Sequence, residues 1–195
     1  MGINSVINKA VFEKFQQLHT ERLLLRRITE SDVKNIFEIY SDPETARFDW
    51  YYPIESMDKV TKIIDSFEEG YEEKEEITWG VVRKDDNKLI GYCCLGDFQE
   101  GSRSCEIGYG FNREYWNKGY GTEAVQIMVK FAFEEMNINR IAGTVTLGND
   151  ASIKVLKKCG FQQEGIFSQR TFMKGEFVDD VILAILMEDY KRATN

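Results

Sequence analysis

The sequence predicts an α/β domain in which helices cover both faces of a mixed, mostly antiparallel sheet. Three observations favour this class. Apolar residues recur at helical spacing between residues 33 and 67, strand-like segments with short turns fill residues 77–111, and helices alternate with strands from residue 122 onward. The 195 residues are 43% hydrophobic, which is enough for one core. We therefore expect one domain over residues 20–195, preceded by a partly helical N-terminal extension at residues 1–19.

The first part of this domain is expected to form a strand followed by two helices. The apolar stretch 22–28 predicts the strand, and Thr29 with Asp32 resembles a capping box that opens the first helix. This helix is expected to end near Asp42, and Ser56 is expected to cap the second one. The apolar residues that mark the two buried faces are Val33, Ile36, Phe37 and Tyr40, then Val60, Ile63, Ile64 and Phe67.

Two unusual stretches accompany these helices. Residues 47–53 place four aromatic side chains in a predicted loop, where they either line a substrate pocket or cover a helix end. Trp50 and Tyr51 are the candidate substrate contacts of this loop. The acidic stretch 68–76 is typical of a solvated face, and the alternative is a patch that attracts a cationic substrate.

Residues 77–111 are predicted to form an antiparallel meander of three strands. The segments 77–83, 89–97 and 103–111 are joined by short polar turns, as an antiparallel arrangement allows. Side chains alternate along a strand, so Glu106 shares one face with Gly108 and Gly110. Because the two glycines carry no side chain, we expect room beside Glu106 on that face.

From residue 122 the chain is expected to alternate between helices and strands. The pattern predicts helices at 122–135 and 151–158, a strand at 140–147, and a final pair of strands around a turn at Lys174 and Gly175. In the last strand the run 181–187 is continuously apolar. Such a run is typical of a strand that is covered on both faces.

A glycine-rich loop at residues 115–122 stands between the meander and the first of these helices. Gly119 and Gly121 allow the backbone to turn its amides toward one point, and the helix that follows adds the positive end of its dipole. Such a loop can bind a phosphate group, although an ordinary tight turn would use the same glycines. With Ala124 the glycines also fit the dinucleotide fingerprint G-x-G-x-x-A, but the preceding meander argues against a Rossmann unit.

The composition narrows the classes of partner. The formal net charge of -8 argues against nucleic acid as the main partner and favours a cationic substrate. The chain has no apolar run of membrane-spanning length and no secretory signal pattern, so we expect a cytoplasmic protein that binds no membrane. The four cysteines lack metal-ligand spacing, so we expect reduced thiols and no metal, and His19 as the only histidine argues against a histidine relay.

Four motifs in order resemble the GNAT superfamily of acyl-CoA-dependent N-acyltransferases, and within it the Rim-type branch of ribosomal-protein N-terminal acetyltransferases. The resemblance extends from about Thr20 to Tyr190. The motifs are Thr20-Glu21-Arg22-Leu23-x-Leu25-Arg26, Glu106-Ile107-Gly108-Tyr109, Tyr115-Trp116-x-Lys118-Gly119-Tyr120-Gly121-Thr122-Glu123-Ala124, and Asn149-x-x-Ser152 followed by Gly160-Phe161.

The resemblance implies a binding site for acetyl-CoA. It implies that backbone amides of the loop hold the pyrophosphate, and that the strand ending at Phe111 splays from its neighbour and pairs with the pantetheine arm. Gly110 is compatible with a bulge there, whose freed N–H could polarise the thioester carbonyl. Trp116 stands where the family usually has Gln or Arg. The residues expected to bind the cofactor are Phe111, Trp116, Asn117, Lys118, Gly119, Tyr120, Gly121, Thr122 and Asn149.

Glu106 and Ser152 are the candidate catalytic residues. Glu106 would act as general base through a water, or else would only orient the sheet or bind the substrate ammonium. Many family members carry a tyrosine that protonates the thiolate at the position of Leu156 here, so the acid must be another group. Ser152 resembles the serine of the Rim-type branch, which could donate a hydrogen bond to the sulfur. The alternatives are that Ser152 only helps to start a helix and that Asn149 only caps it.

These motifs predict an N-acetyltransferase that moves the acetyl group of acetyl-CoA to a primary amine. Deprotonating a lysine-like amine at pH 7 costs about 4.6 kcal/mol, against about 1.4 kcal/mol for an α-amine, so a protein N-terminus needs the weaker base. We therefore expect a protein or peptide N-terminus as the acceptor. The alternatives are a polyamine or aminoglycoside, a non-catalytic acyl-CoA-binding regulatory module, and a nucleotide-dependent oxidoreductase. A homodimer stays open.

Overall fold

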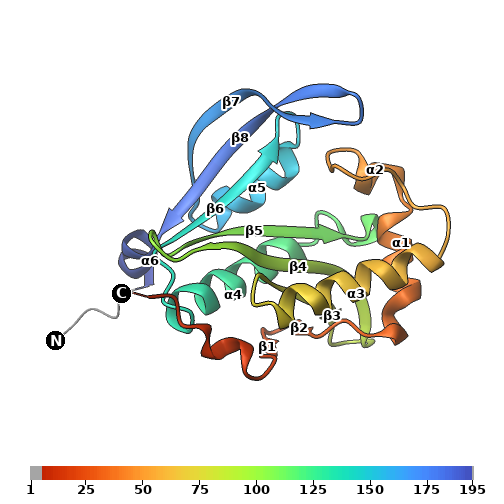
Figure 1. Ribbon diagram of the computed structural model, residues 1–195, viewed down its shortest axis with the longest axis horizontal. Helices are drawn as coiled ribbons and strands as arrows, with labels where there is room; N and C mark the ends of the chain where they lie inside the picture. The colour runs from red at the N-terminus through yellow and green to blue at the C-terminus, as the bar shows by residue number, and fades with distance from the viewer. Residues whose placement is uncertain (1–5, 195) are drawn as a thin grey trace.

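An eight-stranded sheet runs through residues 6–194, which the computed structural model describes (Figure 1). The strands are β1 (Leu18–His19), β2 (Leu23–Arg26), β3 (Glu76–Arg83), β4 (Lys88–Gln99), β5 (Ser104–Phe111), β6 (Arg140–Thr146), β7 (Gln162–Met173) and β8 (Glu176–Leu186). The α-helices are α1 (Val33–Tyr40), α2 (Pro43–Ala46), α3 (Asp58–Glu72), α4 (Tyr120–Glu134), α5 (Asp150–Lys158) and α6 (Met187–Thr194). Short 3-10 turns are η1 (Lys9–Phe12), η2 (Glu30–Asp32) and η3 (Arg113–Tyr115).

The sheet is mixed and mostly antiparallel, as the sequence predicts. Its strand order is β1-β2-β3-β4-β5-β6-β8-β7, and every neighbouring pair except β5 and β6 is antiparallel. The parallel pair is joined through α4, which supplies the long crossover that parallel strands require. β7 and β8 form a long hairpin that arches toward α2 (Figure 1).

Helices cover both faces of the sheet, and this prediction is also confirmed. On one face α4 and α5 bury a large core around Trp79, Leu95 and Met128. On the other face α1 and α3 bury a smaller core that includes Ile36 and Val60. The division follows from strand alternation, which gives each half-buried strand two sets of side chains pointing in opposite directions.

Local sequence signals placed several helix starts correctly. Thr29 and Asp32 form the predicted capping box, although one 3-10 turn precedes α1. The N-cap of α3 is Met57 and not Ser56 as predicted, although the Ser56 hydroxyl, one residue earlier, accepts a hydrogen bond from the Asp58 amide at 3.3 Å. α4 begins at Tyr120, two residues earlier than predicted.

The end of the chain differs from the prediction. The last strand stops at Leu186, and Met187 begins α6, which the sequence reasoning did not anticipate. The continuous apolar run concealed the boundary, because the period of a short apolar run cannot distinguish a strand from a helix.

The N-terminal residues that the structure describes pack onto the rest of the chain. Ile7, Val11 and Phe12 are buried in the larger core, and Leu18–His19 pairs with β2. Within residues 6–194 no helix is both long and apolar enough to cross a membrane.

Candidate active site

The strands β5 and β6 separate at the centre of the sheet. They pair only at Ser104–Glu106 and Arg140–Ala142, and beyond this point they diverge toward the upper right of Figure 1. The divergence leaves one side of β5 without a strand partner, so the backbone there is available to a ligand. The splay that the resemblance implies is therefore present, and it ends at Phe111.

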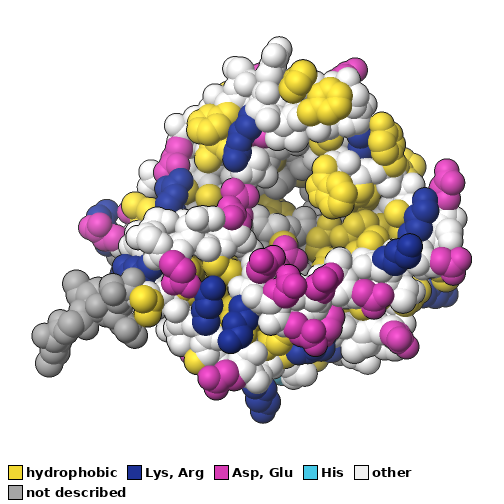
Figure 2. Space-filling view, in the orientation of Figure 1, with side chains coloured by type: hydrophobic (Ala, Val, Ile, Leu, Met, Phe, Trp, Pro, Cys, Tyr) yellow, Lys and Arg dark blue, Asp and Glu magenta, His cyan; other side chains and the backbone are white. Residues whose placement is uncertain are grey.

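A cavity of about 1050 Å³ occupies this splay and opens to the surface. Its lining comes from both sides of the sheet, with Thr78 and Cys94 on one side and Tyr109 and Ser152 on the other. Figure 2 shows the hollow, with hydrophobic side chains gathered above and to the right of it and acidic side chains below. The cavity thus connects the two faces of the sheet.

The glycine loop lies next to the end of β5. Asn117 and Gly119 have positive φ angles of 58° and 82°, and Gly119 is the N-cap of α4. The amides of the first turn of a helix have no partner within the helix, so this backbone offers donors and a dipole to an anion. The Trp116 indole N–H donates to the Phe111 carbonyl at 2.7 Å, which ties the loop to β5. These features fit a pyrophosphate group.

An ion pair between Arg22 and Glu123, which the sequence did not predict, contacts the glycine loop. The Glu123 carboxylate accepts hydrogen bonds from the Thr20 hydroxyl at 2.6 Å, the Arg22 amide at 3.0 Å and Arg22 Nε at 2.6 Å. Arg22 also donates to the Lys118 carbonyl at 3.1 Å. We name the group Thr20, Arg22 and Glu123 the loop clamp. Thr20 and Arg22 belong to the motif at residues 20–26, and Glu123 belongs to the motif at residues 115–124. The two motifs lie about 100 positions apart in the chain, and only the fold brings them together.

Glu106 stands where β5 and β6 separate. Burial raises the pKa of this carboxyl, and the negative charge of Asp97 adds to the effect. Glu106 is not one of the described residues that line the cavity, whereas its strand neighbour Ile107 and the nearby Asp97 are.

One detail of the predicted surroundings of Glu106 is wrong. Gly110 pairs regularly with Tyr92, and the irregular register in this strand pair lies between Gly96 and Gln99, so Gly110 forms no bulge. Gly108 lines the cavity, but side chains of β4 lie close above both glycines. A Cβ on Gly108 would lie 2.9 Å from Cys94 Sγ, and one on Gly110 would lie 2.7 Å from the Tyr92 ring. The glycines serve close packing of the neighbouring strand's side chains.

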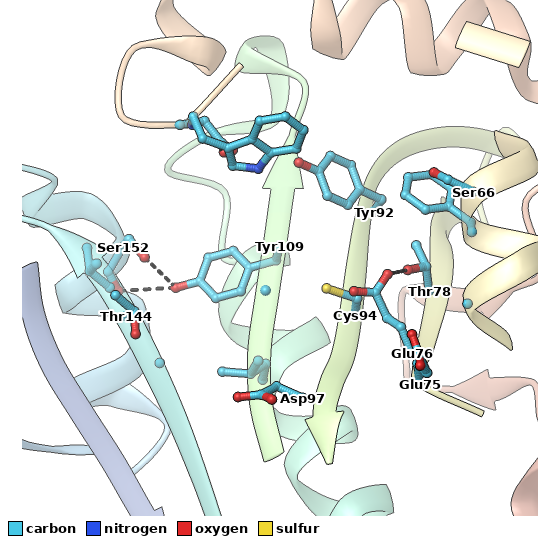
Figure 3. A pocket seen from close by; sticks show the side chains of 18 of the residues that line it. Ser66, Glu75, Glu76, Thr78, Tyr92, Cys94, Asp97, Tyr109, Thr144 and Ser152 are labelled. Carbon is cyan, nitrogen blue, oxygen red and sulfur yellow. Dashed lines mark hydrogen bonds between the residues drawn. The ribbon is translucent and has the colours of Figure 1, made fainter. Parts of the chain in front are cut away.

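Asn149 and Ser152 come together at the start of α5. The Asn149 side chain accepts from the Ser152 amide at 3.2 Å, so Asn149 caps the helix and lines the cavity at once. The Ser152 hydroxyl is hydrogen-bonded to the Tyr109 hydroxyl at 2.8 Å (Figure 3). Sequence reasoning used Tyr109 only as a motif residue, since nothing local in the chain signals a contact 43 positions away.

Two aromatic side chains of residues 47–53 divide between the cavity and the end of helix α1. Trp50 lines the cavity and is 77% exposed, so it belongs to the rim. Tyr51 instead packs against Tyr40, with ring centroids 4.7 Å apart, and joins the smaller core. The structure thus brings Trp50 to the cavity but does not place Tyr51 on its lining.

The half of the cavity next to α3 contains polar groups that sequence reasoning did not select. Glu76 accepts a hydrogen bond from the Thr78 hydroxyl at 2.5 Å, and Cys94 lies beside them (Figure 3). Burial raises the pKa of the Cys94 thiol, with the charge of Glu76 as the next cause, so the thiol stays protonated. Glu76 belongs to the acidic stretch 68–76, most of which is solvated while its end reaches the cavity. Strand alternation with Thr78 could have indicated this.

All four cysteines are free thiols, as expected. Cys93 and Cys105 are buried within the larger core. Burial raises the pKa of Cys105 to about 12 and also raises that of Cys93, which keeps both thiols unreactive at neutral pH.

A sheet splayed between β5 and β6, together with a glycine loop at the start of α4, is the arrangement that the resemblance to the acyl-CoA-dependent N-acyltransferases implies. The family profile described as "Acetyltransferase (GNAT) domain" matches residues 22–162. The chain therefore belongs to the GNAT family, and it is an acetyl-CoA-dependent N-acetyltransferase.

Several relatives agree with this assignment. The uncharacterized N-acetyltransferase YoaA of Bacillus subtilis is 34% identical over 172 residues, which cover 88% of this chain and 97% of that protein. The putative ribosomal N-acetyltransferase YdaF of the same organism is 25% identical over 175 residues, covering 88% and 94%. A crystal structure of a GNAT-family acetyltransferase from Bacillus anthracis superposes with a TM-score of 0.80 at 28% identity, covering 89% of this chain and 99% of that one.

Proposed function

We propose that this enzyme acetylates the N-terminal α-amine of a protein or peptide. The observation that carries the proposal is the open end of the cavity, which a folded polypeptide can approach. Trp50 is 77% exposed at the rim, and Phe172 and Phe177 at the tip of the β7–β8 hairpin are each 63% exposed. Exposed aromatic side chains of this kind are typical of surfaces that contact another polypeptide.

The part of the cavity between β5 and α5 would hold the thioester end of acetyl-CoA, and the glycine loop, none of whose residues lines the cavity, would hold the pyrophosphate end. The loop backbone of residues 116–122, which includes Asn117, Lys118, Tyr120, Gly121 and Thr122, would donate to the pyrophosphate. Lys118 would add a positive charge. The unpaired edge of β5 up to Phe111 would pair with the amides of the pantetheine arm, and Asn149 would contact the same arm from the start of α5.

Glu106 would be the general base. It would accept a proton from the acceptor ammonium through a water, and its raised pKa suits a group that must exchange protons near neutral pH. The neutral amine then attacks the thioester carbonyl, and the carbon–sulfur bond breaks. Ser152 would donate a hydrogen bond to the sulfur as negative charge develops there.

A polyamine or aminoglycoside is the second candidate acceptor, and the acidic lining of the cavity favours it. The carboxylates that line the cavity are Asp49, Glu73, Glu75, Glu76 and Asp97. Together with the aromatic faces of Tyr40 and Phe67, they would suit a ligand with several positive charges. A peptide N-terminus needs only one such charge.

An acetylation assay with a panel of amines tests the proposal. The purified chain is incubated with acetyl-CoA and with N-terminal peptides, a lysine-containing peptide blocked at its N-terminus, spermidine and an aminoglycoside. We expect the highest kcat/KM for the unblocked peptides. Preference for spermidine would instead establish the second candidate, and binding of acetyl-CoA without transfer to any amine would indicate a regulatory acyl-CoA-binding module.

A further inference from the structure

We propose that Tyr109 positions Ser152 so that its hydroxyl proton faces the sulfur of coenzyme A and stabilises the thiolate. The inference rests on the proposed acetyl transfer, but it does not depend on which amine is the acceptor. It assigns to Tyr109, on β5, the support of the leaving group that Leu156 cannot provide.

The hydroxyls of Tyr109 and Ser152 meet at the splay between β5 and β6. Tyr109 lies three residues beyond the last β5 residue that pairs with β6, and Ser152 lies in the first turn of α5. Both side chains line the cavity, and they meet across the splay (Figure 3). A thioester that enters between the diverging strands would pass beside this pair.

The hydrogen bonds between Tyr109 and Ser152 decide which hydroxyl has a proton to spare. The Tyr109 hydroxyl lies 2.8 Å from Ser152 Oγ, where either hydroxyl can be the donor, and it can also donate to the Ser152 carbonyl oxygen at 3.2 Å. A phenol and a serine hydroxyl each supply one proton. If Tyr109 gave its proton to the carbonyl, Ser152 would donate to Tyr109. We assign the Tyr109 proton to the shorter contact with Ser152 Oγ, and the serine proton is then released for a third partner in the cavity. Without the phenol, the serine hydroxyl could turn to a backbone carbonyl of its own helix instead.

Two threonine hydroxyls also line this half of the cavity. Thr146 donates its proton to the Phe48 carbonyl at 3.2 Å, whereas Thr144 accepts from Arg170 at 3.2 Å and keeps its own proton. Leu156 is buried, with its methyl group 2.8 Å from the place that a Cβ on Gly143 would take, and it has no proton to donate. Ser152 differs from Thr144 in having a second hydroxyl, that of Tyr109, within 2.8 Å to orient its proton.

Electrostatics indicates how the pair acts. Burial raises the pKa of Tyr109, and the Ser152 hydrogen bond only partly opposes this, so the phenol stays protonated at neutral pH. The pair therefore donates hydrogen bonds without losing a proton. In the reaction the N–C bond forms, and the C–S bond breaks with its electron pair leaving on sulfur. The proton that finally neutralises the thiolate comes from the cationic nitrogen of the intermediate.

A titration of bound coenzyme A tests the inference without turnover. Coenzyme A with ¹³C at the methylene next to sulfur is bound to the enzyme, and the thiol pKa is read from its chemical shift. In the wild type we expect this pKa to lie below the free value of about 8.5. In Tyr109→Phe it should rise by about one unit, the equivalent of one hydrogen bond. Tyr190→Phe is the matched control, because its hydroxyl bonds to Glu134 outside the cavity.

Kinetics gives a second readout. Tyr109→Phe should lower kcat about 10-fold and leave the KM of the amine unchanged, because only the leaving group is affected. Ser152→Ala should have a similar effect, and the double variant should be no slower than the slower single variant.

The outcomes separate this inference from the proposed function. If the wild type binds coenzyme A but transfers acetyl to none of the amines, the proposed function fails. If the wild type transfers acetyl and Tyr109→Phe keeps both the wild-type thiol pKa and kcat, the inference is overturned. A lower melting temperature with an unchanged thiol pKa would also overturn it, because Tyr109 would then only tie β5 to α5.

Discussion

Replacing Glu123 by Gln should loosen the glycine loop, because this carboxylate is the centre of the loop clamp. Its first oxygen accepts from the Thr20 hydroxyl and the Arg22 amide, and its second lies 2.6 Å from both Nε and Nη2 of the Arg22 guanidinium. A Gln side chain has one carbonyl oxygen and one NH₂ group. Whichever way the amide is turned, two donors would face its NH₂ group.

The magnitude follows from these contacts. A hydrogen bond to a charged group contributes about 1.5–3 kcal/mol, but the Arg22 side chain is 43% exposed, so water recovers part of the loss. We expect Glu123→Gln to reduce the free energy of unfolding by about 2 kcal/mol. For a chain of this size, that loss lowers the melting temperature by about 4–8 °C.

The effect should depend on pH in a defined direction. Burial alone would raise the pKa of Glu123, but hydrogen bonds from Thr20 and Arg22 outweigh it and hold the pKa below its usual value. A carboxyl whose pKa is lowered on folding stabilises the protein above its unfolded pKa, and this contribution disappears as pH falls through the folded pKa. The difference between wild type and variant should therefore vanish in acid.

Thermal melts and acetyl-CoA titrations check this prediction. Arg22 contacts the Lys118 carbonyl, so we also expect the dissociation constant of acetyl-CoA to rise about 10-fold. Glu135→Gln is the matched control, since it removes the same charge at an exposed site beyond the other end of α4. If Glu123→Gln has the melting temperature of the control variant and the wild-type dissociation constant for acetyl-CoA, the loop clamp does not stabilise the glycine loop.

Three further variants address the fold and the site. Asp32→Asn leaves Arg26 without the carboxylate that two of its nitrogens contact at 2.8 Å. Because Asp32 is only 4% exposed, the substitution should lower the free energy of unfolding, measured in urea, by about 3 kcal/mol. A loss below about 1 kcal/mol would refute this. Gly119→Ala places a side chain at φ 82°, so it should cost about 1–2 kcal/mol and weaken acetyl-CoA binding in calorimetry, whereas Gly101→Ala, which meets nothing within 4 Å, should do neither. Glu106→Gln should lower kcat/KM about 10²-fold. Because the pKa of Glu106 is raised, wild-type activity should fall as pH drops through that raised value, and a pH–rate profile unchanged by the substitution would remove its role as base.

Local sequence patterns predicted much of the fold. The capping box at Thr29 and Asp32 and the hydrogen bond from the Asp58 amide to the Ser56 hydroxyl join residues a few positions apart, so their geometry is nearly independent of the rest of the chain. The positive φ of Gly119 belongs to the same group, since only a residue without Cβ adopts it without strain. The prediction was wrong at the boundary between β8 and α6, which lies within a run of apolar residues. The residues stay apolar on both sides of the boundary, so the change from strand to helix leaves no mark in the composition.

The surroundings of the site residues could not be predicted in the same way. The space beside Glu106 depends on which residues of β4 face Gly108 and Gly110, and this is set by strand register. A shift of one residue would turn Tyr92 and Cys94 to the opposite face. The sequence therefore predicted a carboxylate beside two glycines but not the Tyr92 ring and the Cys94 thiol that pack against them.

The sequence by itself determined the class of enzyme and the place of the glycine loop. Those conclusions depend on residues close together in the chain, such as the glycines of the loop at 115–122, whose backbone chemistry is local. Only the tertiary structure decided which groups meet in the splay between β5 and β6. Tyr109 and Ser152 are 43 positions apart, and Glu123 lies about 100 residues from Thr20 and Arg22. Contacts over such distances depend on strand order and helix packing, which bring distant parts of the chain together only when the whole core has formed.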